Sequence, residues 1–242
     1  MQGKIGEREP GIRNRLKECF KKGMVISMAQ SIENMWAQRL TLEEAREIYT
    51  SCVGEDFPPE EIKPFAVIEK MWKKGSYQAY GFYEEIQPDS ETGEEAADGS
   101  VCRELCAYAF LLTNKEKHVL LLDYFAVCSK KRGEGYGSFA LSLLRKECFG
   151  WDALVIEVED DDLDTIDETV RLIRKRRISF YTHAGCVMTS TRSRVWDVDY
   201  RIMTMPFLDT EAWTGMAEKV TALYGGMYDE EAMEKHFAIT AI

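Results

Sequence analysis

The stretch from Val119 to Val158 constrains the fold more than any other part of the chain. It opens with VLLLDYFAV, an almost unbroken apolar run that is typical of a strand covered on both faces of a sheet. A glycine-rich loop follows, and from Tyr136 apolar residues recur at i, i+3, i+4, i+7 and i+8, which indicates a helix. A second apolar run, ALVIEV, closes the stretch. A strand, a helix and a strand in this order predict a βαβ unit with parallel strands and a right-handed crossover.

Further strands and helices are predicted on both sides of this unit. Thr41 and Glu44 form a capping box in front of a helical segment, and Pro64 is expected to break or kink a second one. The expected fold is a mixed α/β, α+β-like arrangement in three layers, with a central mixed twisted sheet flanked by helices. The additional strands are expected at 35–39, 77–83, 104–113, 186–192 and 199–207, and the additional helices at 42–53, within 58–75 and at 169–185.

The chain is expected to form one main domain with an addition at each end. Residues 1–33 are a basic N-terminal extension, and residues 34–208 form the α/β domain. Residues 209–242 are expected to be a helical tail that packs back on the domain, because one helical face collects apolar side chains; an apolar face left exposed there would favour a homodimer. That face consists of Trp213, Met216, Ala217, Val220, Leu223 and Tyr224.

Charge and cysteine content exclude several classes of protein. The formal net charge is −11 and the isoelectric point is near 5.0, which argues against a nucleic-acid-binding face because such a face needs a basic stripe. No apolar run is long enough to span a membrane, and the N-terminus lacks the apolar segment of a signal peptide, so we expect a cytoplasmic protein. The seven cysteines are scattered without CxxC pairs, which indicates reduced, mostly buried thiols and no metal site.

The loop KKRGEGYGS, residues 130–138, joins the predicted strand to the predicted helix. The first amides of a helix lack partners, and the helix dipole is positive at this end, so a strand-to-helix junction can bind an anion. Glycines allow close approach of a phosphate, and three basic residues precede them. The loop has no GK[ST] sequence for a nucleoside triphosphate, and its G-x-G-x-G spacing differs from the dinucleotide G-x-G-x-x-G pattern.

The residues R-G-E-G-Y-G within this loop match the R/Q-x-x-G-x-G/A signature of the GNAT N-acetyltransferase superfamily. The segment LLLDYFAVCSKKRGEGYGSFALSLL resembles that superfamily's fourth strand, pyrophosphate loop and third helix, and RRISFYTHAGC resembles its later F-Y-x-x-x-G-F element. The chain departs from the pattern in two places. An acidic insertion, DDDLDTIDETVRLIRK, replaces the usual short N-x-x-A link, and Cys186 stands where the final aromatic residue is expected.

This resemblance implies a sheet whose parallel fourth and fifth strands splay apart to admit acetyl-coenzyme A, the expected co-substrate. The backbone of Phe125, Ala126 and Val127 would pair with the pantetheine arm. The pyrophosphate would bind the loop residues Arg132, Gly133, Glu134, Gly135, Tyr136, Gly137 and Ser138.

Three residues are candidates for catalysis. Tyr181 matches the tyrosine that often acts as general acid near the cofactor sulfur in this superfamily; packing against the sheet is its alternative role. Asp123 lies within an apolar strand, where a carboxylate is costly unless it is paired or faces a cleft, so it is either a base or a structural ion-pair partner. Glu157 is the comparable acid of the fifth strand, either a site residue or the partner of a neighbouring arginine.

The expected function is direct transfer of an acetyl group from acetyl-coenzyme A to a primary amine. An alternative is a non-catalytic sensor or scaffold that binds coenzyme A or an acyl-coenzyme A, and a third is a nucleotide-binding protein that uses the same loop. The acceptor is not readable from the sequence, although an acidic cleft would favour a cation.

Overall fold

The computed structural model describes residue 32 and residues 34–86, 102–207 and 214–241. Most of the basic extension, the polar loop 87–101 and Trp213 lie outside the described residues. Within the described part, no helix is both long enough and apolar enough to cross a lipid bilayer.

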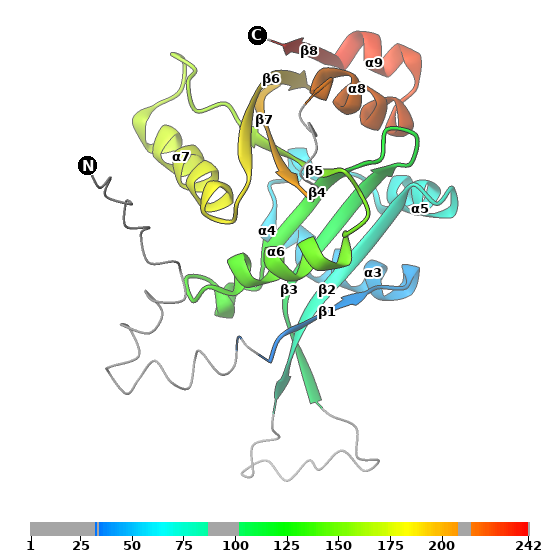
Figure 1. Cartoon of the computed structure of the whole chain (residues 1–242), viewed down its shortest axis with the longest axis vertical. Helices are drawn as coiled ribbons and strands as arrows, with labels where there is room; N and C mark the ends of the chain where they lie inside the picture. Colours follow the sequence, from blue (N-terminus) through cyan, green and yellow to red (C-terminus); the bar gives the residue numbers. More distant parts are fainter. Residues whose placement is uncertain (1–31, 33, 87–101, 208–213, 242) are drawn as a thin grey trace, which may run out of the picture.

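One eight-stranded sheet forms the centre of the molecule, in the order β1-β2-β3-β4-β5-β7-β6-β8 (Figure 1). All neighbouring strands are antiparallel except β4 and β5, which are parallel, so the predicted βαβ unit and mixed sheet are confirmed. The strands are β1 (Trp36–Arg39), β2 (Tyr77–Ile86), β3 (Cys102–Asn114), β4 (Val119–Val127), β5 (Ala153–Glu159), β6 (Val187–Val195), β7 (Val198–Pro206) and β8 (Phe237–Ala241).

The helices begin where the sequence supplies caps or breaks. Thr41 and Glu44 form the predicted capping box of α3, Asp167 caps α7, and Pro64 stands immediately before α5 and separates it from the turn that precedes it. The helices are α3 (Leu42–Ile48), α4 (Gly54–Asp56), α5 (Phe65–Lys73), α6 (Tyr136–Glu147), α7 (Glu168–His183), α8 (Met216–Met227) and α9 (Glu230–His236), with short helical turns at Tyr49–Val53, Pro59–Glu61 and Ser129–Lys131.

Helices cover both faces of the sheet, which gives the three layers that the sequence predicts. On one face, α6 and α7 pack against a core that includes Tyr136, Leu141 and Tyr181. On the other face, α3, α5 and α8 cover a second core that includes Ile68 and Val220. Because β4 and β5 contribute side chains to both cores, the centre of the sheet is buried on both sides.

The strands β4 and β5 pair over only part of their length. Parallel pairing is confined to Val119–Leu121 against Ala153–Val155, after which the two strands diverge. Beyond that point β4 stays paired with β3, and β5 stays paired with β7. The register of β4 shifts at Asp123, so that Leu122 and Tyr124 have successive partners on β3 and Asp123 has none. This β-bulge turns the strand as it leaves β5.

The tail contains more than the predicted helix. In α8, Met216, Val220, Leu223 and Tyr224 are buried, as the helical face predicts. The helix α9 and the strand β8 were not predicted, and β8 pairs with β6 to extend the central sheet. The sequence FAITA is short and has no local signal of its own, so its partner strand determines its conformation.

Candidate functional site

A cavity of about 1000 Å³ occupies the place where β4 and β5 diverge. Its walls include Phe125, Phe180 and Tyr181 from the α6–α7 side of the sheet, and Tyr124 and Tyr224 from the α5–α8 side. One continuous pocket therefore opens toward both faces of the sheet. A volume of this size is in the range of small-molecule sites in proteins.

The last three residues of β4 line this pocket and offer an open backbone edge. Phe125, Ala126 and Val127 pair with β3 on one side, but β5 has already left the other side. Their groups that face the pocket are available to an extended ligand, in the way that an added strand would use them. The structure thus places the three predicted pantetheine-binding residues at the pocket wall.

The glycine loop follows directly and ends at the first turn of α6. Gly133 and Gly135 have φ values of +82° and +95°, a left-handed conformation that a side chain disfavours. Gly137 lies in the first turn, where an added Cβ would come within 3.2 Å of the Phe180 ring and of a Val127 methyl group. The loop therefore presents a bare helix N-terminus beside the open end of β4, a suitable arrangement for a phosphate.

Two of the three basic residues before the glycines form ion pairs with carboxylates of the protein. Lys131 pairs with Glu84, and also with Glu104 at 2.9 Å. Arg132 pairs with Asp56, and its Nε donates to the carbonyl of Val127 at 2.9 Å. The side chain of Arg132 also lines the pocket.

Other predicted loop residues differ in exposure. Tyr136 is buried and its hydroxyl donates to Glu84 at 2.7 Å, whereas Glu134 and Ser138 are exposed. Any contact of Tyr136 with a ligand phosphate would therefore come from its backbone amide.

Tyr181 lies in α7 with its side chain against the pocket and is only 8% exposed. Burial raises the pKa of its phenol above the ordinary value, although the nearby Arg177 acts in the opposite direction. Among the described residues, the hydroxyl has no hydrogen-bond partner. A protonated, unsatisfied hydroxyl that faces a cavity can donate a proton to a bound ligand.

Asp123 lines the pocket and forms a buried ion pair. Its carboxylate contacts the Lys63 ammonium at 2.7 Å and accepts a second hydrogen bond from the hydroxyl of Tyr77. Burial by itself would lower the pKa of Lys63, but the Asp123 carboxylate raises it above its ordinary value. The structural ion pair that the sequence left open is therefore present, and it holds the segment before α5 against β4.

Glu157 lies in β5 on the α5–α8 side of the pocket. Its carboxylate accepts hydrogen bonds from Ser193 Oγ at 3.1 Å and from the hydroxyl of Tyr224. Burial raises the pKa of this carboxyl, and the two hydrogen bonds only partly offset the effect. A carboxylate with a raised pKa is a better proton acceptor near neutral pH than an ordinary glutamate.

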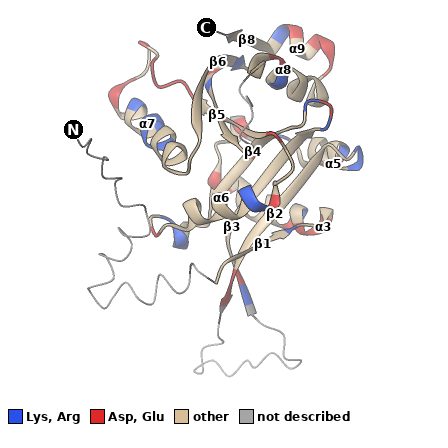
Figure 2. Ribbon diagram, in the orientation of Figure 1, with Lys and Arg blue, Asp and Glu red and all other residues tan. Residues whose placement is uncertain are grey.

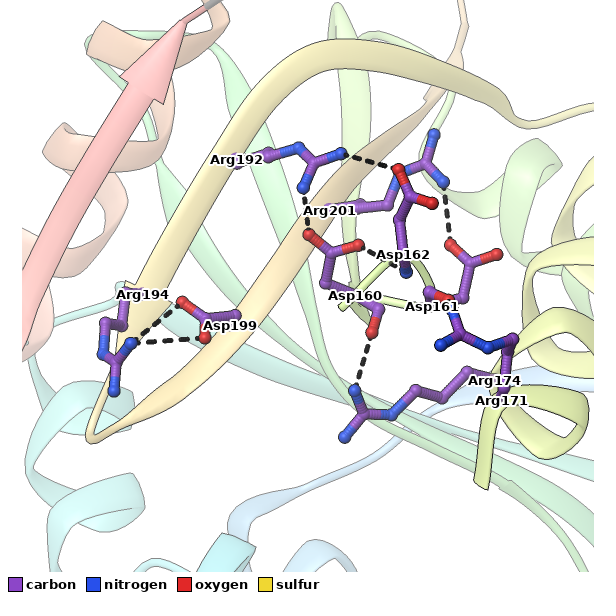
Figure 3. A network of polar contacts seen from close by, with 9 residues as sticks. All are labelled: Asp160, Asp161, Asp162, Arg171, Arg174, Arg192, Arg194, Asp199 and Arg201. Carbon is purple, nitrogen blue, oxygen red and sulfur yellow. Dashed lines mark hydrogen bonds and ion pairs between the residues drawn. The ribbon is translucent and has the colours of Figure 1, made fainter. Parts of the chain in front are cut away.

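The acidic insertion between β5 and α7 is held by arginines from three elements (Figure 3). Asp160 is 2% exposed and pairs with Arg192 of β6, while Asp161 pairs with Arg201 of β7 at 2.7 Å. From α7, Arg174 donates to the backbone carbonyl of Asp160 at 2.6 Å. Arginines of α7 and of the strands β6 and β7 together hold the acidic turn.

Figure 2 shows the same distribution at lower magnification, with acidic residues in the loop before α7 and basic residues along the helix. Two of those basic residues, Arg174 and Arg177, line the pocket and both pair with Glu159. The α7 side of the pocket therefore carries positive charge close to the open end of β4.

The structure gives no support to a cysteine nucleophile at the end of β4. Burial raises the pKa of the Cys128 thiol to about 11, so it is protonated at neutral pH. Within the described ranges, no group of histidine, cysteine, aspartate or glutamate side chains is arranged to hold a metal ion.

Several pocket residues could not be predicted from the sequence. Lys63, Trp196, Tyr200 and Tyr228 all line the pocket but belong to a turn, a hairpin and the tail. For Tyr228 the only available signal was the apolar face of the tail helix, which ends four residues earlier. Nothing local to Lys63 indicates its partner, which is 60 residues away in the chain.

Comparison with known proteins identifies the fold. No protein-family model matches the chain, and no curated protein matches its sequence. Among solved structures, a putative acetyltransferase from the GNAT family of Bacteroides thetaiotaomicron is similar at a TM-score of 0.53 and 19% identity, with 79% of this chain and 99% of that chain covered. This likeness shows that the chain has the GNAT fold.

Two further matches have lower TM-scores. The spermidine N-acetyltransferase of Vibrio cholerae in complex with CoA and spermine has a TM-score of 0.47 at 10% identity over 72% of this chain and 96% of that one. The ribosomal-protein-S18-alanine N-acetyltransferase of Escherichia coli has a TM-score of 0.43 at 16% identity over 73% and 96%.

Proposed function

We propose that the protein is an N-acetyltransferase that transfers an acetyl group directly from acetyl-coenzyme A to a primary amine. The observation that carries this proposal is the pocket at the β4–β5 divergence, which is lined by the open β4 edge and by Arg132 at the start of the glycine loop, and which also contains the carboxylate of Glu157. The GNAT fold of a putative acetyltransferase supports it.

The residues of this chain fit the coenzyme. Phe125, Ala126 and Val127 would pair with the pantetheine arm, and the loop from Arg132 to Ser138 would hold the pyrophosphate; at Gly133 there is open space beside the backbone, and at Gly137 the missing Cβ allows close packing of Phe180 and Val127. Arg132, Arg174 and Arg177 line the pocket and can contact phosphate groups. Acetyl-coenzyme A would supply an activated carbonyl and a thiolate leaving group.

The proton transfers are assigned to two residues on opposite sides of the pocket. Glu157 would accept a proton from the incoming ammonium group, which frees the nitrogen lone pair for attack on the acetyl carbon. Tyr181 would donate its proton to the departing sulfur and be reprotonated as the new amide nitrogen loses its second proton. One proton is released to solvent in each cycle. Asp123 would keep the Lys63 side chain in place, and its negative charge would contribute to the electrostatic potential at the bound amine.

A calorimetric titration with acetyl-coenzyme A tests the proposal, with Gly135→Glu as the variant. A glutamate at this position places negative charge in the phosphate loop, so binding should weaken by at least about tenfold. Gly150→Glu is the matched control, because Gly150 also has a positive φ of +114° with open space around it but follows the C-terminus of α6, at the opposite end of the helix from the glycine loop. The control should bind like the wild type.

Failure of the wild-type protein to bind acetyl-coenzyme A at millimolar concentration would refute the proposal. Binding without acetyl transfer to any amine would instead favour the alternative of a coenzyme A-binding sensor.

A further inference from the structure

The α5–α8 side of the pocket is walled by aromatic rings. We call this part the aromatic chamber, and its rings come from β4, the β6–β7 turn, β7, α8 and the residue that follows α8. It is lined by Tyr124, Trp196, Tyr200, Tyr224 and Tyr228. The rings of Tyr224 and Tyr228 are stacked, with centroids 6.0 Å apart and planes at 14°. Such walls bind flat apolar groups and cations better than strongly hydrated chains.

The C-terminal segment completes this chamber. Of its five rings, Tyr224 belongs to α8 and Tyr228 is the residue directly after that helix, and a third, Trp196, stacks on His236 of α9 with centroids 3.7 Å apart. Figure 1 shows α8, α9 and β8 gathered at one end of the sheet, beside β6 and β7. The tail is therefore part of the binding surface as well as a cover for the core.

Trp196 is held in an unusual backbone conformation at the edge of the chamber. Trp196 and Asp197 form the two-residue turn between β6 and β7, and both have positive φ, at +47° and +68°. Such a turn normally uses asparagine and glycine, so two ordinary side chains are costly here. The Trp196 amide donates to the His236 carbonyl at 3.0 Å, and the indole remains 49% exposed. The tail thus fixes a large, partly exposed ring beside the pocket.

Among the described residues that line the pocket, one carboxylate is available to an incoming cation. Asp56, Asp123 and Glu159 line the pocket but each has a basic partner, and Glu61 is not free either. Glu157 forms no ion pair with any described residue and has only hydroxyl donors, Ser193 and Tyr224. A ligand with one ammonium group can therefore be neutralised here, whereas a second or third ammonium would meet aromatic walls and the Lys63 cation.

We propose that the aromatic chamber is the acceptor site and that its substrate is a small primary monoamine with a flat apolar body, whose ammonium group binds Glu157 and whose body lies among Trp196, Tyr200 and Tyr228. The proposal rests on the proposed function and adds the acceptor class to it. In the reaction the amine gains the acetyl group, the thioester carbon–sulfur bond breaks, and the ammonium loses two protons, one recovered by the thiol and one released.

The test uses the full chain with 2-phenylethylamine as probe and spermidine and a lysine-containing peptide as competing acceptors. With saturating acetyl-coenzyme A, kcat/KM for 2-phenylethylamine should exceed that for either competitor by at least about tenfold. Trp196→Ala should raise KM for 2-phenylethylamine about tenfold and leave KM for acetyl-coenzyme A unchanged. Glu218→Gln removes one exposed carboxylate from the same tail and serves as the control, with both constants unchanged.

A second measurement separates this proposal from the proposed function. Calorimetric titration of 2-phenylethylamine in the absence of acetyl-coenzyme A should show binding that Glu157→Gln abolishes. If acetyl-coenzyme A binds but 2-phenylethylamine neither binds nor is acetylated, or if spermidine or the peptide is preferred, the acceptor assignment is overturned while the acetyltransferase assignment stands. If acetyl-coenzyme A does not bind, the proposed function fails, and amine binding at Glu157 alone would still define the chamber as a monoamine site.

Discussion

The hydroxyl of Tyr181 and the carboxyl of Glu157 line one pocket, and we propose opposite tasks for them. Burial raises the pKa of both groups. For the phenol this keeps the proton in place over the whole neutral range, as a donor requires. For the carboxyl the raised pKa means a higher affinity for a proton, as an acceptor requires. The chemical type of the side chain, together with burial, thus decides its role.

Tyr181→Phe should lower kcat for acetyl transfer about 100-fold, because it removes the proposed proton donor and no other described side chain takes its place. KM for acetyl-coenzyme A should change little, since the ring and its packing against Phe180 remain. Because the pKa of Tyr181 lies above its ordinary value of 10.0, wild-type kcat should show no loss from this group below about pH 10. Steady-state rates of both proteins from pH 6 to 10 check this. An unchanged kcat in the variant would remove Tyr181 from the mechanism.

At the scale of elements, the acidic insertion ties the end of β5 to β6, β7 and α7 (Figure 3). Its first residue, Asp160, accepts from the Asp162 amide at 3.0 Å in addition to its contact with Arg192. The position of the acidic insertion therefore depends on the buried carboxylate of Asp160. The exposed carboxylate of Asp162, which contacts the same arginine, provides the comparison.

Asp160→Asn should lower the free energy of unfolding by about 3 kcal/mol, because it leaves the Arg192 charge without its buried partner. Asp162→Asn should change it by less than about 0.5 kcal/mol, since Asp162 is 74% exposed and lies 3.7 Å from Arg192. Urea unfolding of the two variants measures the difference. Equal effects would show that burial of Asp160 does not govern the stability of this loop.

At the scale of the whole molecule, an acidic protein is proposed to bind an anionic ligand. The formal net charge is −11, whereas Arg132, Arg174 and Arg177 gather at one pocket. Acetyl-coenzyme A at 100 times its dissociation constant should stabilise the folded state by about 2.7 kcal/mol, which corresponds to a rise in Tm of roughly 5–10 °C. A thermal melt with and without the ligand, repeated with Gly135→Glu, measures it; at the same concentration the variant, with at least tenfold weaker binding, should show at most about half the rise. The same shift in both proteins would place the ligand elsewhere.

The parts of this molecule that could be predicted from the sequence are those that local patterns determine. The βαβ unit was predictable because Val119–Val127 and the helix after Gly135 carry their periodicity within themselves. The same holds for the capping box at Thr41. Pairings between distant segments could not be predicted: Lys63 with Asp123, Glu157 with Tyr224, and β8 with β6. The chamber was missed for the same reason, since its rings come from segments that approach one another only in the folded sheet.

The short contact between β4 and β5 divides the sheet into two half-sheets. Only three residue pairs join them, and each half is built from one continuous stretch of the chain, β1–β4 from residues 36–127 and β5–β8 from residues 153–241. Every other strand pairing lies within one half-sheet, so the short pairing between β4 and β5 is the weakest strand pairing in the sheet. A ligand that binds where β4 and β5 diverge would contact both half-sheets and hold them together. Binding there would therefore slow amide hydrogen exchange most at the facing ends of β4 and β5, far more than at the outer edges of the molecule.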